Sequence, residues 1–84
     1  MIVGVFSLRD AKLSGFSRPF FAQTEAQAVR MVQDLVNSGQ QDDVCKHPDD
    51  FELWCLGSFD DEFGELVSDV KAVILCSSLV VAKP

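Results

Sequence analysis

Length, composition and charge exclude several classes of protein for this chain. Its 84 residues fall below the usual ~100–200 residues of a domain, so we expect a single domain over residues 1–84. The 48% apolar content and seven Phe argue against intrinsic disorder, and the net charge of −6 disfavours a protein that binds nucleic acid over its whole surface.

The first quarter of the chain predicts two extended segments. Residues 2–8 are rich in β-formers and carry apolar side chains at both alternating sets of positions, which favours a central strand or a strand covered on both sides. Turn-forming residues occupy 10–15, and residues 16–22 read as a second strand. Pro19 interrupts this strand and, because it cannot donate to a ladder, marks an edge or a bulge.

A helix is predicted to begin after Thr24, which forms a capping-box pattern with Gln27. Apolar residues at helical spacing form one stripe, and Gly39 follows it in a position that favours a left-handed helix end. Pro48 to Asp50 suits a single helical turn. The stripe consists of Ala28, Met31, Val32, Leu35 and Val36.

The second half of the chain predicts another hairpin. Residues 51–59 alternate as a third strand, with Trp54 and Leu56 on a second face that is buried or faces a partner. Gly64 suits a positive-φ turn position, and residues 65–68 begin the return strand. The apolar run 72–82 is shorter than the ~20 residues of a membrane span, so we expect an extra strand, a short helix or an interface.

These elements predict an α+β fold of type ββαββ, in which two β-hairpins form an antiparallel sheet and one helix packs on a face. A chain of this length buries only about 60–65% of its unfolded surface. We therefore expect a homodimer or a higher homo-oligomer that covers the apolar run or a sheet edge.

The cysteines and the amino terminus favour a reducing compartment and no membrane. Cys45, Cys55 and Cys76 are an odd number without a CxxC pair, so we expect structural thiols and neither disulfides nor zinc. The first ten residues lack the basic and long apolar regions of a secretion signal.

No constellation of catalytic residues stands out. Cys45 and His47 could form a nucleophile and a base, but the sequence offers no third group to orient the imidazole. His47, Asp49 and Asp50 are metal-ligand types, which helix capping by Asp and an exposed His also explain. The acidic turn at 60–65 lacks the ligand spacing of a calcium loop. We expect no enzyme, no metal and no cofactor.

The first hairpin combines basic and aromatic residues in a pattern typical of a binding surface. Residues 1–24 have a net charge of +2, with three basic residues and one acidic residue, whereas residues 25–84 have a net charge of −8. Phosphate-binding cations beside aromatic rings are typical of single-stranded DNA binding. The competing interpretation is that at least two of Phe16, Phe20 and Phe21 belong to the core. The candidate nucleic-acid-binding residues are Arg9, Lys12, Phe16 and Arg18.

The sequence also resembles a protein family. Its central segment reads His47-Pro48-x-Asp50-x-x-Leu53-x-x-x-Gly57-x-Phe59-Asp60-x-x-x-Gly64, and an earlier segment reads Pro19-Phe20-Phe21-Ala22-x-Thr24 followed by Ala28-x-Arg30. Both resemble the nonstructural proteins of microviruses, especially of gokushoviruses, over about residues 17–66. The tail beyond Ser68 departs from the polar ends expected of that family.

The resemblance implies a bacteriophage protein of the host bacterial cytoplasm that acts in viral DNA replication or in packaging of the single-stranded genome. Its partner would be single-stranded DNA or the viral replication complex, and the family contributes no catalytic residues. The alternative is an acidic protein-interaction module that engages a host or viral protein without touching DNA, which the net charge favours.

Overall fold

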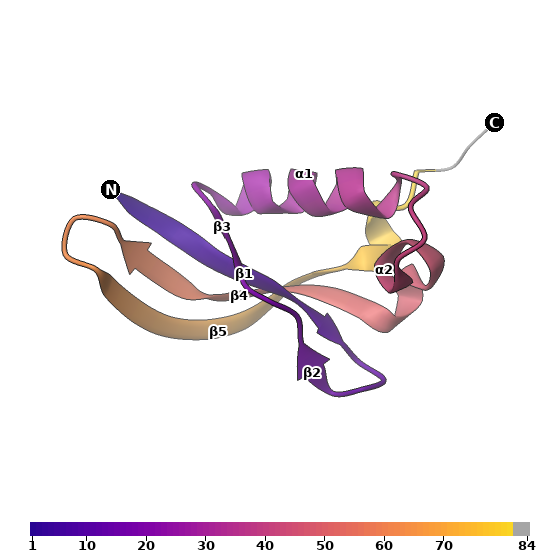
Figure 1. The fold of residues 1–84 in the computed structure, drawn as a ribbon, viewed down its shortest axis with the longest axis horizontal. Coiled ribbons are helices and arrows are strands. Elements are labelled where there is room, and N and C mark those ends of the chain that lie inside the picture. Colours follow the sequence, from indigo (N-terminus) through magenta and orange to yellow (C-terminus); the bar gives the residue numbers. More distant parts are fainter. Residues whose placement is uncertain (82–84) are drawn as a thin grey trace.

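The computed structural model describes residues 1–81 and has the expected α+β architecture, with the helices on one side of an antiparallel sheet (Figure 1). The predicted two hairpins and main helix are confirmed. The strands are β1 (Ile2–Asp10), β2 (Gly15–Phe16), β3 (Phe20–Ala22), β4 (Phe51–Asp60) and β5 (Glu65–Leu75). The helices are α1 (Glu25–Val36), the short α2 (Asp43–Lys46), which the sequence did not predict, and the 3-10 turns η1 (Pro48–Asp50) and η2 (Cys76–Leu79).

Strand β1 is central, as its two apolar faces predict. It pairs with β4 on one side, and on the other side with β2 and then with β3, both antiparallel. Pro19 lies in the gap between these two short strands, because it cannot donate a hydrogen bond to the ladder. The second extended segment is therefore one edge of the sheet, interrupted where the sequence indicated.

The sheet curves where the register between its long strands shifts. The three long strands contain 9, 10 and 11 residues, and the register shifts between Val5 and Phe6 and between Cys55 and Gly57. Extra residues of this kind bend a strand and increase its twist, and β5 follows a long arc in Figure 1. Gly57 occupies this irregular site at φ 146°.

The core lies between the sheet and α1. Phe6 and Leu53 point to this side of the sheet, and Ala28 and Val32 of α1 meet them there. The predicted stripe is confirmed for Ala28, Val32 and Val36, which are buried, whereas Met31 is 44% exposed. Helix α1 is thus held by a narrower stripe than the apolar pattern suggested.

Both ends of α1 are capped. Thr24 Oγ1 accepts a hydrogen bond from the Gln27 backbone N at 3.1 Å, as the capping box predicts. The Gln27 side chain accepts from the backbone N of Gln23 at 2.7 Å, one residue before the expected partner. Gly39 follows the helix at φ 76°, the left-handed conformation expected of a helix end.

The C-terminal apolar run closes the core of its own chain. Its first part completes β5, and η2 then turns back toward α1, with Cys76 fully buried and Leu79 6% exposed. Asn37 fixes this segment, because its side-chain N donates to Leu79 O at 2.9 Å and its side-chain O accepts from Val81 N at 2.9 Å. Leu75 remains 51% exposed, and Ala82 lies outside the described residues.

Candidate nucleic-acid interface

The face of the sheet opposite α1 collects aromatic side chains. Directly paired residues of antiparallel strands point to the same face, and residues next to each other along a strand point to opposite faces. Phe6 and Leu53 face the helix, so their strand neighbours face away from it. The register pairs on the uncovered face are Val3 with Phe59, Val5 with Phe21, Ser7 with Trp54 and Arg9 with Phe16.

The four rings form two contacting pairs, which we call the aromatic platform (Phe16, Phe21, Trp54 and Phe59). The Phe16 and Trp54 centroids are 5.7 Å apart in an edge-to-face arrangement, and those of Phe21 and Phe59 are also 5.7 Å apart, tilted by 50°. Phe16 is 47% exposed and Phe21 54%, while the other two rings are half-buried. The platform thus presents ring surface to solvent at two points.

Hydrogen bonds across the first hairpin hold one of these rings in place. The buried Ser7 Oγ donates to Ser17 O at 2.8 Å, and Ser17 backbone N donates to Leu8 O at 2.8 Å. These bonds attach the segment after β2 to β1, which fixes Phe16 and the neighbouring Arg18 at this edge of the sheet. The strand pairing itself places Trp54.

The charges on this face compensate each other. Arg9 Nη1 lies 3.4 Å from Glu52 Oε1, and the guanidinium lies 6.0 Å from the centre of the Trp54 ring. The indole N–H of Trp54 donates to the same carboxylate at 3.2 Å. Among the residues that the strand register pairs on this face, Arg9 and Glu52 alone are charged, so the net charge of −6 lies elsewhere.

The other two predicted cations do not join Arg9 in one patch. Lys12 Nζ lies 3.5 Å from Asp50 Oδ2, which draws the ammonium toward η1. Arg18 is exposed in the link between β2 and β3, and no hydrogen bond or ion pair of its side chain occurs within residues 1–81. Of the four candidate residues, the fold brings together only Arg9 and Phe16.

The expectation that at least two of the three hairpin Phe belong to the core is wrong. Phe20 alone faces α1, with its ring centroid 6.1 Å from that of Phe6, whereas Phe16 and Phe21 are on the uncovered face. Adjacent strand residues must point to opposite sides, so Phe20 and Phe21 cannot share the core. The candidate set also missed Trp54 and Phe59, although the apolar second face of residues 51–59 indicated the position of Trp54.

The thiols have environments that suit structural roles. Cys76 is fully buried, and its burial, followed by the charge of Glu52, raises the pKa of the thiol to about 11. Cys45 Sγ donates a hydrogen bond to Leu35 O at 2.9 Å, so this thiol points to the C-terminal end of α1.

Within residues 1–81, no group of three or more His, Cys, Asp or Glu is placed to hold a metal ion. None of the helices in this part of the chain is long and apolar enough to span a membrane.

Among known proteins, one family model matches this chain. No curated protein and no solved structure matches the chain. A family described as Phage ORF5 protein matches residues 3–81, which is nearly the whole chain. The chain therefore belongs to the Phage ORF5 protein family and is a bacteriophage protein.

Proposed function

We propose that this protein is a non-enzymatic accessory protein of a gokushovirus-type microvirus, and that it contacts single-stranded DNA during viral DNA replication or genome packaging in the host bacterial cytoplasm. The observation that carries the proposal is the aromatic platform on the one sheet face where the charges cancel. The resemblance of residues 17–66 to microvirus nonstructural proteins supplies the viral context.

The platform suits unpaired bases because every base has a flat π-face that can stack on an aromatic ring. Such stacking contributes about 1–3 kcal/mol per base and tolerates any sequence. Phe16 and Phe21 expose about half of their surface, so each ring has area available to a base. A neutral face also avoids the repulsion that the acidic remainder of the chain would exert on phosphates.

Electrostatic attraction contributes little in this mode of binding. Three hairpin cations free to contact phosphates would give a slope of log affinity against log salt of about −2 for single strands. Arg9 and Lys12 are paired with Glu52 and Asp50, which leaves Arg18 as the hairpin cation without such a pair. We therefore expect weak binding and a slope near −0.7.

Trp54 is the single tryptophan of the chain and sits in the platform, so its fluorescence reports the proposed contact directly. Titration with an oligothymidylate should quench it. Phe16→Ala and Phe21→Ala should each lower the affinity about fivefold to hundredfold. Phe63→Ala is the matched control, because Phe63 is 76% exposed in the opposite hairpin turn and should leave the affinity unchanged.

A protein-interaction module without DNA contact is the second candidate function. The pairing of Arg9 and Lys12 with carboxylates of the same chain favours it, because these cations are then poor phosphate ligands. Absence of Trp54 quenching at low salt, or an equal loss of affinity for Phe63→Ala and Phe16→Ala, would contradict the DNA proposal and favour this second function.

A further inference from the structure

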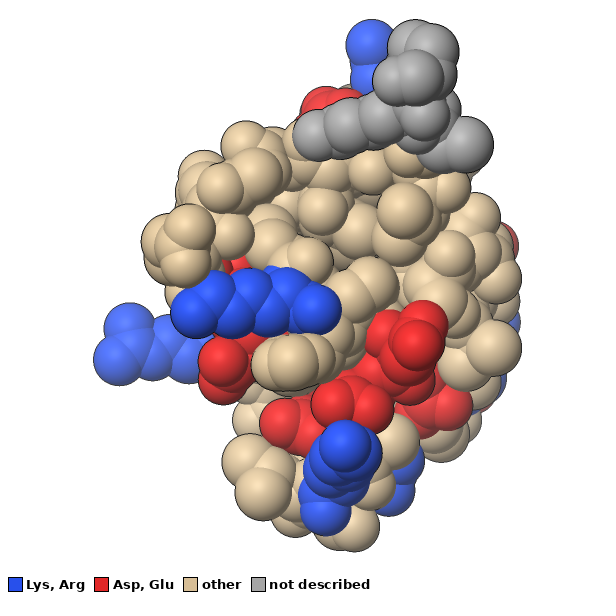
Figure 2. All heavy atoms as spheres, turned by 90° about the vertical axis from the view of Figure 1, so that its right-hand side faces the viewer, with Lys and Arg blue, Asp and Glu red and all other residues tan. Residues whose placement is uncertain are grey.

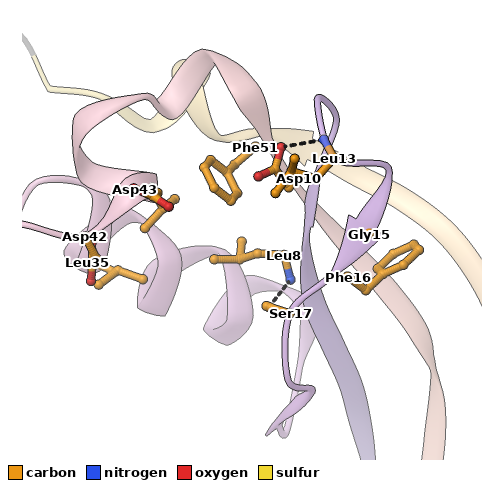
Figure 3. Close-up of a pocket in the computed structure, with 11 residues that line it drawn as sticks. Leu8, Asp10, Leu13, Gly15, Phe16, Ser17, Leu35, Asp42, Asp43 and Phe51 are labelled. Carbon is orange, nitrogen blue, oxygen red and sulfur yellow. Dashed lines mark hydrogen bonds between the residues drawn. The ribbon is translucent and has the colours of Figure 1, made fainter.

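A pocket opens on the helix side of the sheet, and Phe16 of the aromatic platform borders it, with its ring directed away from the cavity (Figure 3). It lies between the tip of the first hairpin, the C-terminal end of α1 and the start of α2, and its volume is about 470 Å³ (Figure 3). This volume falls within the ~300–1,000 Å³ range of ligand sites. Apolar side chains supply most of its lining, namely Leu8, Leu13, Leu35, Val44 and Phe51.

The border of this pocket is acidic. Asp10, Asp42 and Asp43 lie along it, and Asp10 already accepts hydrogen bonds from the backbone N of Lys12 and of Leu13. Asp42 precedes α2 without a side-chain capping bond, and no ion pair of Asp42 or Asp43 occurs in the described chain. Figure 2, which faces this end of the molecule, shows acidic side chains gathered below the centre of the surface, with basic side chains beside them.

We propose that this pocket binds a short segment of a basic protein, in which an apolar side chain flanked by lysine or arginine enters the pocket. The apolar lining fits the side chain, and the carboxylates of Asp42 and Asp43 attract the flanking cations. Binding of the segment also buries part of the Leu13 side chain, which is 81% exposed at the hairpin tip in the free protein.

The charges select this occupant over others. Phosphates of DNA are repelled by the three carboxylates of the border, and the same carboxylates repel an acidic segment of a second copy. The pocket and the platform share only Phe16, so a basic segment in the pocket leaves Phe21, Trp54 and Phe59 open to single-stranded DNA. This inference goes beyond the proposed function and does not depend on it.

The probe for this site is a short peptide with two leucines flanked on each side by lysines, titrated into the full-length ¹⁵N-labelled protein and followed by NMR. Amide shifts should concentrate at Leu8, Leu35 and Val44. A matched peptide with glutamate in place of lysine should cause no shifts. Leu13→Ser should weaken binding without unfolding the protein, because Leu13 is mostly solvent-exposed.

A charge-neutralising variant tests the acidic border. Asp42→Asn combined with Asp43→Asn should lower the affinity for the lysine peptide about threefold to tenfold, the range expected for two exposed ion pairs. The control is Glu62→Gln with Glu65→Gln, which removes the same charge from the opposite hairpin turn and should leave the affinity unchanged.

Three results with the lysine peptide would overturn the proposal: no amide shifts at millimolar concentration, shifts centred on Phe21, Trp54 and Phe59, or equal losses of affinity for the two neutralised pairs. Shifts of the pocket amides by an oligothymidylate would overturn it too. The DNA proposal is tested independently of the pocket, because Phe21 belongs to the platform and does not line the pocket. If Phe21→Ala leaves the quenching of Trp54 by the oligothymidylate unchanged, the DNA proposal fails and the pocket proposal is unaffected.

Discussion

Gly57 is the position where one methyl group should damage this fold most. Its φ of 146° belongs to a region that side chains rarely adopt and that costs about 1–3 kcal/mol. A Cβ built there would lie 1.9 Å from the backbone O of Val67, so β5 would have to move away from β4. We expect Gly57→Ala to lower the free energy of unfolding by about 3 kcal/mol or more, from a total of about 4–12 kcal/mol for a chain of this size.

Urea unfolding at one fixed protein concentration measures this change, and a loss of 3 kcal/mol lowers the midpoint by about 2–3 M. Two other glycines serve as graded controls. Gly15 has nothing within 4 Å of a built Cβ, so Gly15→Ala should change stability by less than about 1 kcal/mol. Gly64 is equally open but has φ 68°, so Gly64→Ala should cost about 1–2 kcal/mol. A Gly57→Ala loss no larger than that of Gly15→Ala would refute the reasoning.

Three further predictions concern the tail, the thiol and the sheet edge. Asn37→Ala removes bonds to Leu79 and Val81 and should cost about 1–3 kcal/mol in urea unfolding, with faster amide exchange at Val81 as the specific sign. Because burial raises the pKa of Cys76 from 9.0 to about 11, the unfolded chain loses this proton first. Stability should therefore fall as pH rises from 9 toward 11, less steeply in Cys76→Ala, and an unchanged slope would contradict the assignment. Strand β5 is an uncovered edge with Leu66 and Val70 exposed, so we expect homo-oligomers through this edge that Val70→Lys dissociates; sedimentation of the unmodified protein as a monomer at high micromolar concentration would contradict this.

Local patterns in the sequence were sufficient to predict the two hairpins, the main helix and their order. Alternation identified β1, β4 and the start of β5, Pro19 marked the interrupted edge, and Thr24 with Gly39 bounded α1. These signals are local, because each depends on backbone preferences or on residues within two turns of the chain. The short α2 lacks such a signal, since four residues offer no period.

The curvature of the sheet could not be predicted in the same way. A bulge in β4 or β5 shifts the pairing between the strands by one residue. The amino-acid pattern of a strand looks the same with or without such a bulge. Gly57 could equally have been an unremarkable strand residue, and only the register with Val5 and Ser68 shows that it sits where the strands bend. This bend, in turn, decides which rings share a face.

The candidate site also differs from its sequence prediction because it depends on which residues the strand pairing brings together. The basic character of the first hairpin is a count along the chain, whereas the field on a surface depends on which carboxylates the fold places beside each cation. Arg9 meets Glu52 and Lys12 meets Asp50 across strand and turn contacts far apart in sequence, and this pairing removes most of the predicted charge. Pairing of strands also adds Trp54 and Phe59, so the uncovered face becomes aromatic and nearly neutral. A surface of that kind favours stacking over phosphate attraction, which is why quenching of Trp54 discriminates between the two functions better than salt dependence does.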